Sequence, residues 1–127
     1  MGECVVPHPC TVLVVDDDPS TRALMMTWLE IGGYDVRTAS NGSEALTLLR
    51  HEAPSLMIVD LDMPVMDGAE LRRQQLLLPA VCAIPFILVS GARNAARIAR
   101  ALGIADVLTK PFGADRLLRI VGLLCHA

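Results

Sequence analysis

The chain has 127 residues, of which 53% are hydrophobic and 3% aromatic, and its formal net charge is −3. That length suffices for one domain with its own core, and the composition excludes a disordered chain and a polyanion binder. Because no basic stretch carries interleaved aromatics, a nucleic-acid surface is not expected. The sequence has no basic segment followed by an apolar leader, and no apolar run approaches the roughly 18 residues of a membrane span. We therefore predict a cytoplasmic protein.

The four cysteines, Cys4, Cys10, Cys82 and Cys125, include no C-x-x-C pair. Their contexts are typical of an intracellular protein, so we do not expect a disulfide framework. Residues 1–10 are predicted to form a poorly ordered N-terminal tail, as chain ends do by default, in front of a folded domain over residues 11–127.

Five short apolar runs alternate along the chain with segments of helical periodicity. The runs cover residues 11–15, 34–39, 55–59, 85–90 and 106–109, and the helical segments cover 20–31, 43–52, 67–78, 92–102 and 114–124. This alternation indicates repeated βα units and a parallel sheet covered on both faces. The first, third and fourth runs are continuously apolar, as buried central strands are. The predicted fold is an α/β, (βα)5 three-layer sandwich with strand order 2-1-3-4-5.

Local signals mark where several helices begin and end. Asp18 followed by Pro19 is a good helix start, and Asp67 is a plausible N-cap of the third helix. Glycines at positions 32, 33 and 103 are expected to stop the first and fourth helices. The helical period predicts core-facing residues in the first and fifth helices: Leu24, Met25, Trp28, Leu29, Leu117, Ile120, Val121 and Leu124.

Polar residues follow the central strands where each apolar run ends. Asp16 and Asp17 follow the first run, Asp60 the third, Ser90 ends the fourth, and Lys110 follows the fifth. In an open parallel α/β sheet, ligands bind beyond the carboxyl ends of the strands. Three carboxylates, one hydroxyl and the single lysine of the chain are therefore expected to converge on one site.

This set of side chains suits phosphoryl transfer. Carboxylates form a hard-oxygen pocket for Mg²⁺, which keeps water positions open for a phosphoryl oxygen. The Lys110 ammonium and the Ser90 hydroxyl can hold further phosphoryl oxygens and stabilise the charge of the transferring group. Asp60 is the predicted nucleophile, because a carboxylate can form an acyl phosphate directly. Asp16 and Asp17 are the predicted metal ligands.

The chain resembles the receiver domain of two-component response regulators over residues 11–125. The motifs that carry the resemblance are VLVVDDDPSTR, VRTASNGSEAL, MIVDLDMPVMDG, ILVSGA and ADVLTKPF. The resemblance implies a flavodoxin-like fold and a phosphoacceptor signalling domain that catalyses only its own phosphorylation and dephosphorylation. It also implies a phosphohistidine donor on a sensor histidine kinase or a histidine phosphotransfer protein.

The same resemblance implies a particular metal site. Asp17 and Asp60 would bind Mg²⁺ through their carboxylates, helped by the backbone carbonyl of Asp62, while Asp16 would act mainly through a metal-bound water. The side chain of Asp62 has two interpretations that the sequence leaves open. It either orients or hinders the water that hydrolyses the acyl phosphate, or it simply faces solvent.

Ser90 and Lys110 would hold the phosphoryl oxygens, and the resemblance implies a cis peptide between Lys110 and Pro111. One position departs from the family. Receiver domains usually place Tyr or Phe three residues before the lysine, and the ring turns inward as the domain switches. This chain has Val107 there, and a β-branched aliphatic side chain cannot make the same swing. The aromatic readout is therefore in doubt, while the phosphorylation chemistry is not.

Arg93, Arg97 and Arg100 are predicted to form one stripe on the fourth helix. Receiver domains often use the face made by helix 4, strand 5 and helix 5 for dimerisation or output. The stripe could meet an acidic partner, an output partner or a second copy on this face, and a solvated stripe is the alternative. Neither a nucleic acid nor a membrane is expected as a direct partner.

Two other functions stay open. Asp60, Leu61 and Asp62 match the D-x-D signature of haloacid-dehalogenase-like phosphatases, in which Asp60 would be the nucleophile of an aspartyl-phosphate hydrolase and Asp62 its general acid/base. That family normally has Thr where this chain has Pro64. The second alternative is a pseudo-receiver, which binds a partner without being phosphorylated.

Overall fold

The computed structural model describes residues 10–125, and the predicted tail over 1–10 lies outside the described residues except for Cys10. Five parallel strands form one sheet in the order β2-β1-β3-β4-β5. They are β1 (Thr11–Val15), β2 (Asp35–Ala39), β3 (Leu56–Asp60), β4 (Phe86–Ser90) and β5 (Asp106–Thr109). The predicted strand order is confirmed, because β1, β3 and β4 occupy the interior of the sheet and the two mixed runs form its edges.

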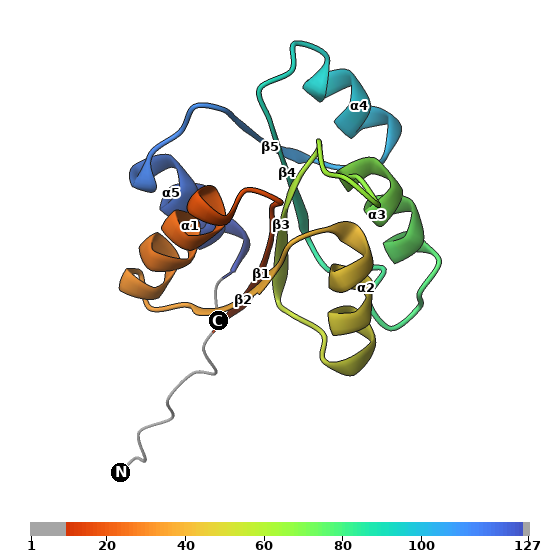
Figure 1. Ribbon diagram of the computed structural model, residues 1–127, viewed down its shortest axis with the longest axis horizontal. Coiled ribbons are helices and arrows are strands. Elements are labelled where there is room, and N and C mark those ends of the chain that lie inside the picture. The colour runs from red at the N-terminus through yellow and green to blue at the C-terminus, as the bar shows by residue number, and fades with distance from the viewer. Residues whose placement is uncertain (1–9, 126–127) are drawn as a thin grey trace.

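Five helices cover the sheet in two layers, so the predicted three-layer sandwich is confirmed (Figure 1). They are α1 (Pro19–Ile31), α2 (Gly42–His51), α3 (Gly68–Leu76), α4 (Ala95–Ala101) and α5 (Ala114–Leu124). Alternate strand residues face opposite layers. Val12 and Val14 belong to the core cluster that contains α1 and α5 residues, and Leu13 and Val15 belong to the cluster on the other face.

Most helix ends lie where local chemistry predicts them. The side chains of Asp18 and Asp67 each accept a hydrogen bond from a backbone N–H in the first turn of α1 and α3. Pro19 opens α1, where its missing N–H has no partner to lose. Beyond α1 and α4 the chain turns through Gly33 (φ 93°) and Gly103 (φ 68°). Only glycine adopts such positive φ values without strain.

Two predictions about the helices are wrong. Leu24 is 49% exposed although it was expected on the core face, whereas its neighbour Met25 is buried. The helix predicted from residue 92 begins only at Ala95, so Arg93 precedes α4 and the predicted stripe on this helix is wrong for Arg93. The Ser90 hydroxyl accepts a hydrogen bond from the Ala92 N–H, which holds the chain in a turn before the helix starts.

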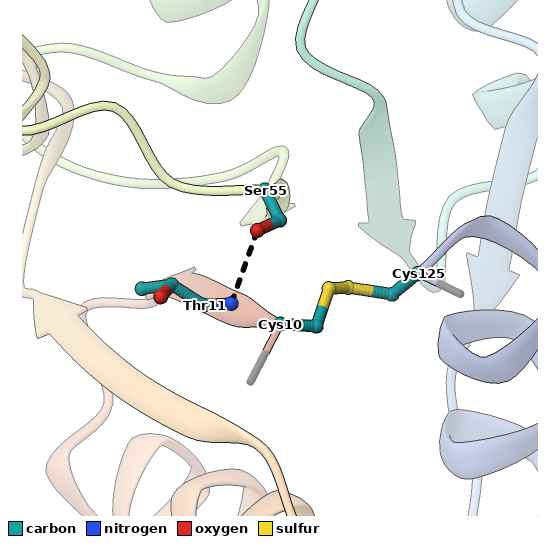
Figure 2. Close-up of a disulfide and its surroundings, with 4 residues drawn as sticks. All are labelled: Cys10, Thr11, Ser55 and Cys125. Atoms are coloured by element: carbon teal, nitrogen blue, oxygen red, sulfur yellow. Dashed lines mark hydrogen bonds between the residues drawn. A yellow bond between two sulfur atoms is a disulfide. The ribbon is translucent and has the colours of Figure 1, made fainter. Parts of the chain in front are cut away.

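Cys10 and Cys125 form a disulfide that joins the start of β1 to the end of α5 (Figure 2). Their Cα atoms are 6.0 Å apart, a usual spacing for bridged cysteines. The expectation of no disulfide is therefore wrong for this pair. Their sequence separation of 115 residues hid the pairing, because only the folded chain brings its two ends together. Cys82 is exposed and free.

Two buried polar side chains tie α3 to the segments around it. The Gln75 amide donates hydrogen bonds to the carbonyls of Val81 and Ile84, in the segment that leads to β4. The Arg72 guanidinium donates to two carbonyls at the end of α4 and to the Gln75 side chain. Every bond satisfies a group that burial would otherwise leave unpaired. The sequence patterns gave no sign of this network.

Candidate functional site

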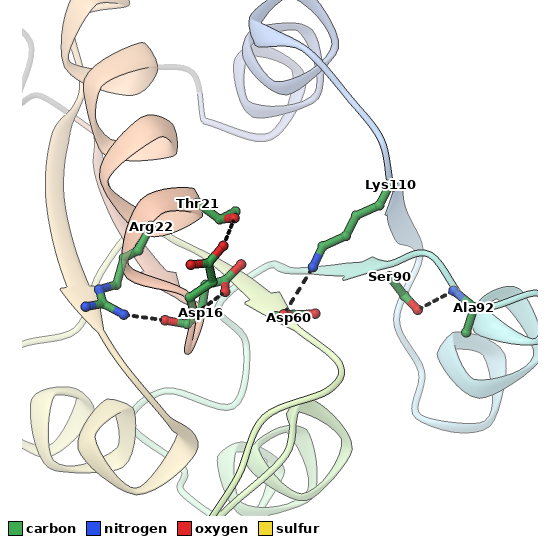
Figure 3. Close-up of polar contacts among 8 residues, drawn as sticks. Asp16, Thr21, Arg22, Asp60, Ser90, Ala92 and Lys110 are labelled. Carbon is green, nitrogen blue, oxygen red and sulfur yellow. Dashed lines mark hydrogen bonds and ion pairs between the residues drawn. The ribbon is translucent and has the colours of Figure 1, made fainter.

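The carboxyl ends of β1, β3, β4 and β5 meet at one edge of the sheet, and the predicted site lies at this edge (Figure 3). The register of β1 and β3 places Asp16 beside Asp60 at the ends of neighbouring strands. Ser90 is the last residue of β4, and Lys110 directly follows β5. The fold therefore brings side chains that are up to 94 residues apart in the sequence to one place.

Three carboxylates gather at this edge. Asp16, Asp17 and Asp60 each offer one oxygen, and these oxygens lie within 4.8 Å of one another. Asp16 and Asp60 are buried, with 2% and 5% exposure, whereas Asp17 is exposed. Asp62 is also exposed and its carboxylate does not belong to the cluster. One open side of the cluster therefore faces solvent.

The cationic and hydroxyl groups of the site lie on the side of β4 and β5. Lys110 Nζ is 3.2 Å from Asp60 Oδ2, and this ion pair links the two strand ends. Ser90 is 1% exposed, and its Oγ accepts the Ala92 N–H at 3.0 Å, which leaves the hydroxyl proton free to be donated. The peptide between Lys110 and Pro111 is cis, as the resemblance implies.

The cluster fits a hard divalent cation. Asp16 Oδ1 accepts the Asp18 N–H at 2.9 Å, but Asp16 Oδ2 is buried without a hydrogen-bond partner among residues 10–125. A buried carboxylate oxygen without a partner is expensive unless a cation or water completes its shell. Carboxylate oxygens are the ligands that Mg²⁺ prefers. Asp16, Asp17 and Asp60 are therefore the residues that would hold the ion.

Burial shifts the acid–base behaviour of the two inner carboxylates. Desolvation raises the pKa of Asp60, although Lys110 opposes this shift, and desolvation likewise raises the pKa of Asp16. A folded-state pKa above the ordinary value of 3.8 means that the folded protein binds protons more tightly than the unfolded chain. Without a cation, the free energy of unfolding therefore falls as the pH rises from about this value through the raised pKa values.

Magnesium is expected to stabilise the protein more at about pH 7.5 than at about pH 5, because its ligands must be deprotonated and the ion offsets their repulsion. Above the dissociation constant, each tenfold increase in the Mg²⁺ concentration should add about 1.4 kcal/mol to the free energy of unfolding. Thermal unfolding in a Mg²⁺ titration at both pH values measures this. Asp16→Ala should abolish the response and Asp62→Ala should keep it. An equal response in these two variants would contradict the assigned ligands.

The loop after β3 approaches Asp60 closely. The Gly68 N–H donates to the Leu61 carbonyl at 2.9 Å, and a Cβ on Gly68 would lie 2.6 Å from the carbonyl oxygen of Asp60. Gly68 is therefore required by close backbone contact. In the same loop, Val65 is 84% exposed and has φ of 71°, which is rare for a β-branched residue.

Arg22 is a site-proximal residue that the sequence analysis missed. Its guanidinium donates a hydrogen bond of 2.7 Å to the backbone carbonyl of Asp16 (Figure 3). The available signal was its place one helical turn after the N-cap Asp18, which directs a long side chain back toward the strand end. Val107 is half-buried and packs against the core cluster on its face of the sheet.

The doubly wound fold places the chain among the open α/β proteins, whose ligand sites lie beyond the carboxyl ends of the strands, where the acidic cluster of this chain lies. The profile of the response regulator receiver domain matches residues 12–122. The chain belongs to this family, whose receiver domains are signalling domains that interact with histidine kinases and output domains. No helix within residues 10–125 is long and apolar enough to cross a membrane.

Individual relatives agree with this assignment. The chain is 44% identical over 118 residues to an uncharacterized 14.6 kDa protein of Leptolyngbya boryana, covering 91% of this chain and 90% of the relative. It is 39% identical to the alkaline phosphatase synthesis transcriptional regulatory protein PhoP of Bacillus subtilis, covering 80% of this chain but 42% of PhoP. The chain thus spans less than half the length of this regulator.

Solved structures show the same fold. The chemotaxis response regulator CheY4 of Vibrio cholerae superposes with a TM-score of 0.86 at 29% identity, covering 91% of this chain and 98% of CheY4. The receiver domain of the Francisella response regulator 1452 superposes with a TM-score of 0.81 at 32% identity, covering 90% and 94% of the two chains. The predicted flavodoxin-like fold is therefore confirmed.

Proposed function

We propose that Asp60 accepts a phosphoryl group from a phosphohistidine donor and that this modification switches the interactions of the domain. The observation that carries the proposal is the 3.2 Å ion pair between Lys110 and Asp60 beside the buried Asp16 carboxylate. The nucleophile thus has a fixed cation on one side and metal-ligand oxygens on the other. These are the charges that stabilise a transferring phosphoryl group.

In the proposed reaction, a carboxylate oxygen of Asp60 attacks phosphorus while the bond from phosphorus to the donor imidazole nitrogen breaks. The imidazole leaves with the electron pair and takes up a proton, and an acyl phosphate remains on Asp60. Attack of water on phosphorus later breaks the bond to the carboxylate oxygen and releases inorganic phosphate. The domain regenerates itself and turns over no separate substrate.

The neighbouring side chains have distinct roles in this proposal. Lys110 neutralises one phosphoryl oxygen, and Ser90 donates its free hydroxyl proton to another. Asp16 and Asp17 hold Mg²⁺ together with Asp60. The bound ion supplies a Lewis acid that neutralises charge on the phosphoryl oxygens. The backbone carbonyl of Asp62 would be a further ligand of the ion, and Asp16 would act mainly through a water bound to it.

The proposed donors are a sensor histidine kinase or a histidine phosphotransfer protein in the cytoplasm, and the proposed output surface is the face made by α4, β5 and α5. Because Val107 stands at the position of the usual aromatic switch, the change on this face would depend on movement of α4 and its preceding turn. Ser90 connects the site to that turn through its hydrogen bond with Ala92.

The first test is phosphoryl incorporation from acetyl phosphate with Mg²⁺, followed by intact mass. We expect the wild type to gain one phosphoryl group and Asp60→Asn to gain none. Asp62→Asn is the matched control, because it removes an exposed carboxylate two residues away and should still be labelled. No gain in the wild type, with either acetyl phosphate or a phosphohistidine donor, would favour a pseudo-receiver. Turnover of small phosphate esters would favour the hydrolase.

A further inference from the structure

A hollow lies at the end of the sheet opposite to the proposed phosphorylation site. Phe86 begins β4 beside this hollow, whereas Ser90 ends the same strand at the site. The hollow has a volume of about 210 Å³, and its walls are mostly apolar and include Ile84, Pro85, Phe86 and Ile104. A concave apolar surface of this kind suits a small ligand, and the polar groups beside it determine which ligand it takes.

The guanidinium of Arg72 is the cation of this hollow. Arg72 lies on α3, lines the hollow and is only 9% exposed. The Phe86 ring centroid is 5.5 Å from its guanidinium carbon, so an aromatic face covers one side of the group. Among the described residues 10–125, Arg72 forms no ion pair with a carboxylate. Because arginines buried to this extent are usually paired, the hollow contains a positive charge that lacks its usual counter-ion.

Part of the hydrogen-bonding capacity of Arg72 is unused. Nε donates to the Leu102 carbonyl at 3.0 Å, Nη2 to the Gly103 carbonyl at 2.9 Å, and Nη1 to the Gln75 side chain at 2.9 Å. A guanidinium has five N–H donors, so one N–H on each Nη atom has no partner among residues 10–125. All three acceptors are neutral, and burial lowers the pKa of Arg72. The bonds therefore do not supply the negative charge that a buried cation needs.

The one acidic residue that borders the hollow does not serve this cation. Asp106 begins β5 at the edge of the hollow. Its neighbour Val107 packs against the core cluster on the side of the sheet that α2, α3 and α4 cover. Since consecutive side chains of a strand point to opposite faces, the Asp106 carboxylate is directed toward the layer of α1 and α5, away from Arg72. The place of a counter-ion in the hollow is therefore left to a ligand.

We propose that this hollow binds a small monocarboxylic acid with an aliphatic or aromatic body. The ligand carboxylate accepts the unused N–H groups of Arg72, and such charge-assisted hydrogen bonds are stronger than those to neutral acceptors. The body of the ligand covers the walls at Phe86 and Ile104 and removes their apolar surface from water. The site lies at the amino ends of β4 and β5, so binding requires neither Asp60 nor phosphoryl transfer.

Other small ligands fit this hollow less well. A neutral apolar molecule would cover the walls but leave the guanidinium without a counter-ion. Inorganic phosphate carries more oxygens than the unused N–H groups of Arg72 can satisfy, and the apolar walls would leave the remaining oxygens without donors. An amine would be repelled by the charge of Arg72. A single carboxylate on an apolar body matches both the charge and the walls.

The test is calorimetric titration of the protein with 4-methylpentanoate and with benzoate at about pH 7.5, where both acids are ionised, each beside its neutral amide. We expect at least one acid to bind with a dissociation constant below about 1 mM and its amide to bind at least about tenfold more weakly. Ala83→Phe, which places a ring on an exposed wall of the hollow, should weaken binding at least about tenfold. Ala80→Phe is the matched control, because Ala80 is exposed in the same segment but does not line the hollow, and it should bind as the wild type does.

Two further variants identify the cation that the acid meets. Arg72→Met should abolish binding, but it also removes the bonds that hold α3 to the end of α4, so Ala83→Phe is the decisive variant. Lys110→Gln should keep the wild-type affinity, because Lys110 lies at the other end of the sheet. Binding that is lost in Lys110→Gln, or kept in Ala83→Phe, would overturn the inference. So would equal affinity for acids and amides, tighter binding of inorganic phosphate, or no binding of either acid up to about 10 mM.

Discussion

A Gly68→Ala variant is expected to lose about 2 to 3 kcal/mol of unfolding free energy and to accept phosphoryl groups about 100-fold more slowly. The added Cβ would lie 2.6 Å from the carbonyl oxygen of Asp60 and 3.0 Å from the Cα of Leu61. Because both contacts are backbone atoms, either the end of β3 or the start of α3 must move. The higher helix propensity of alanine offsets only about 1 kcal/mol.

Urea unfolding and the initial rate of labelling by acetyl phosphate measure the two effects. Gly122→Ala is the matched control, because the same methyl group on α5 would meet only the Tyr34 hydroxyl at 3.8 Å. That variant should be stabilised by about 1 kcal/mol and labelled at the wild-type rate. If both alanine variants shift stability in the same direction, close approach at Gly68 is not the cause.

The parts of the fold that sequence predicts well are those determined by local pattern and by sheet topology. The continuously apolar runs at β1, β3 and β4 had no solvent-facing side, so they had to be interior strands. Once the strands were ordered, the rule that ligands bind at carboxyl ends brought Asp16, Asp60 and Lys110 together without any structural information. The side chains of Asp18 and Asp67 cap their helices for the same local reason.

The parts that sequence missed depend on contacts between distant segments. Gln75 looks like any polar helix residue until the segment leading to β4 folds over it and uses its amide. Leu24 shows the helical period of its neighbours, but the sheet and α5 cover only a narrow stripe of α1, which contains Met25 and not Leu24. The contact of Arg22 with the Asp16 carbonyl could not be predicted without knowing where the end of β1 lies relative to the first turn of α1. The periodicity of apolar residues alone predicts none of these three contacts or exposures.

Loss of the disulfide between Cys10 and Cys125 is expected to lower the melting temperature by about 10 to 15 °C. The bridge closes a loop of 115 residues, almost the whole described domain. In the chain-entropy description, a loop of about 100 residues contributes about 4.7 kcal/mol by restricting the unfolded chain, and measured values often fall below this. Cys10 leads directly into the interior strand β1, so release of this end also loosens a central strand.

Thermal unfolding of the wild type with and without a thiol reductant, beside Cys10→Ser and Cys125→Ser, measures the loss. Cys82→Ser is the control, because Cys82 is exposed and free and its replacement should leave the melting temperature unchanged. The reductant should lower the melting temperature of the wild type and leave the melting temperatures of the Cys10→Ser and Cys125→Ser variants unchanged. Alkylation of both Cys10 and Cys125 in the unreduced, denatured protein would contradict the bridge. Cytosolic thiols are kept reduced, so in that compartment the domain would lack the bridge and its contribution to stability. The same alkylation on protein taken directly from cells therefore tests whether the bridge forms there.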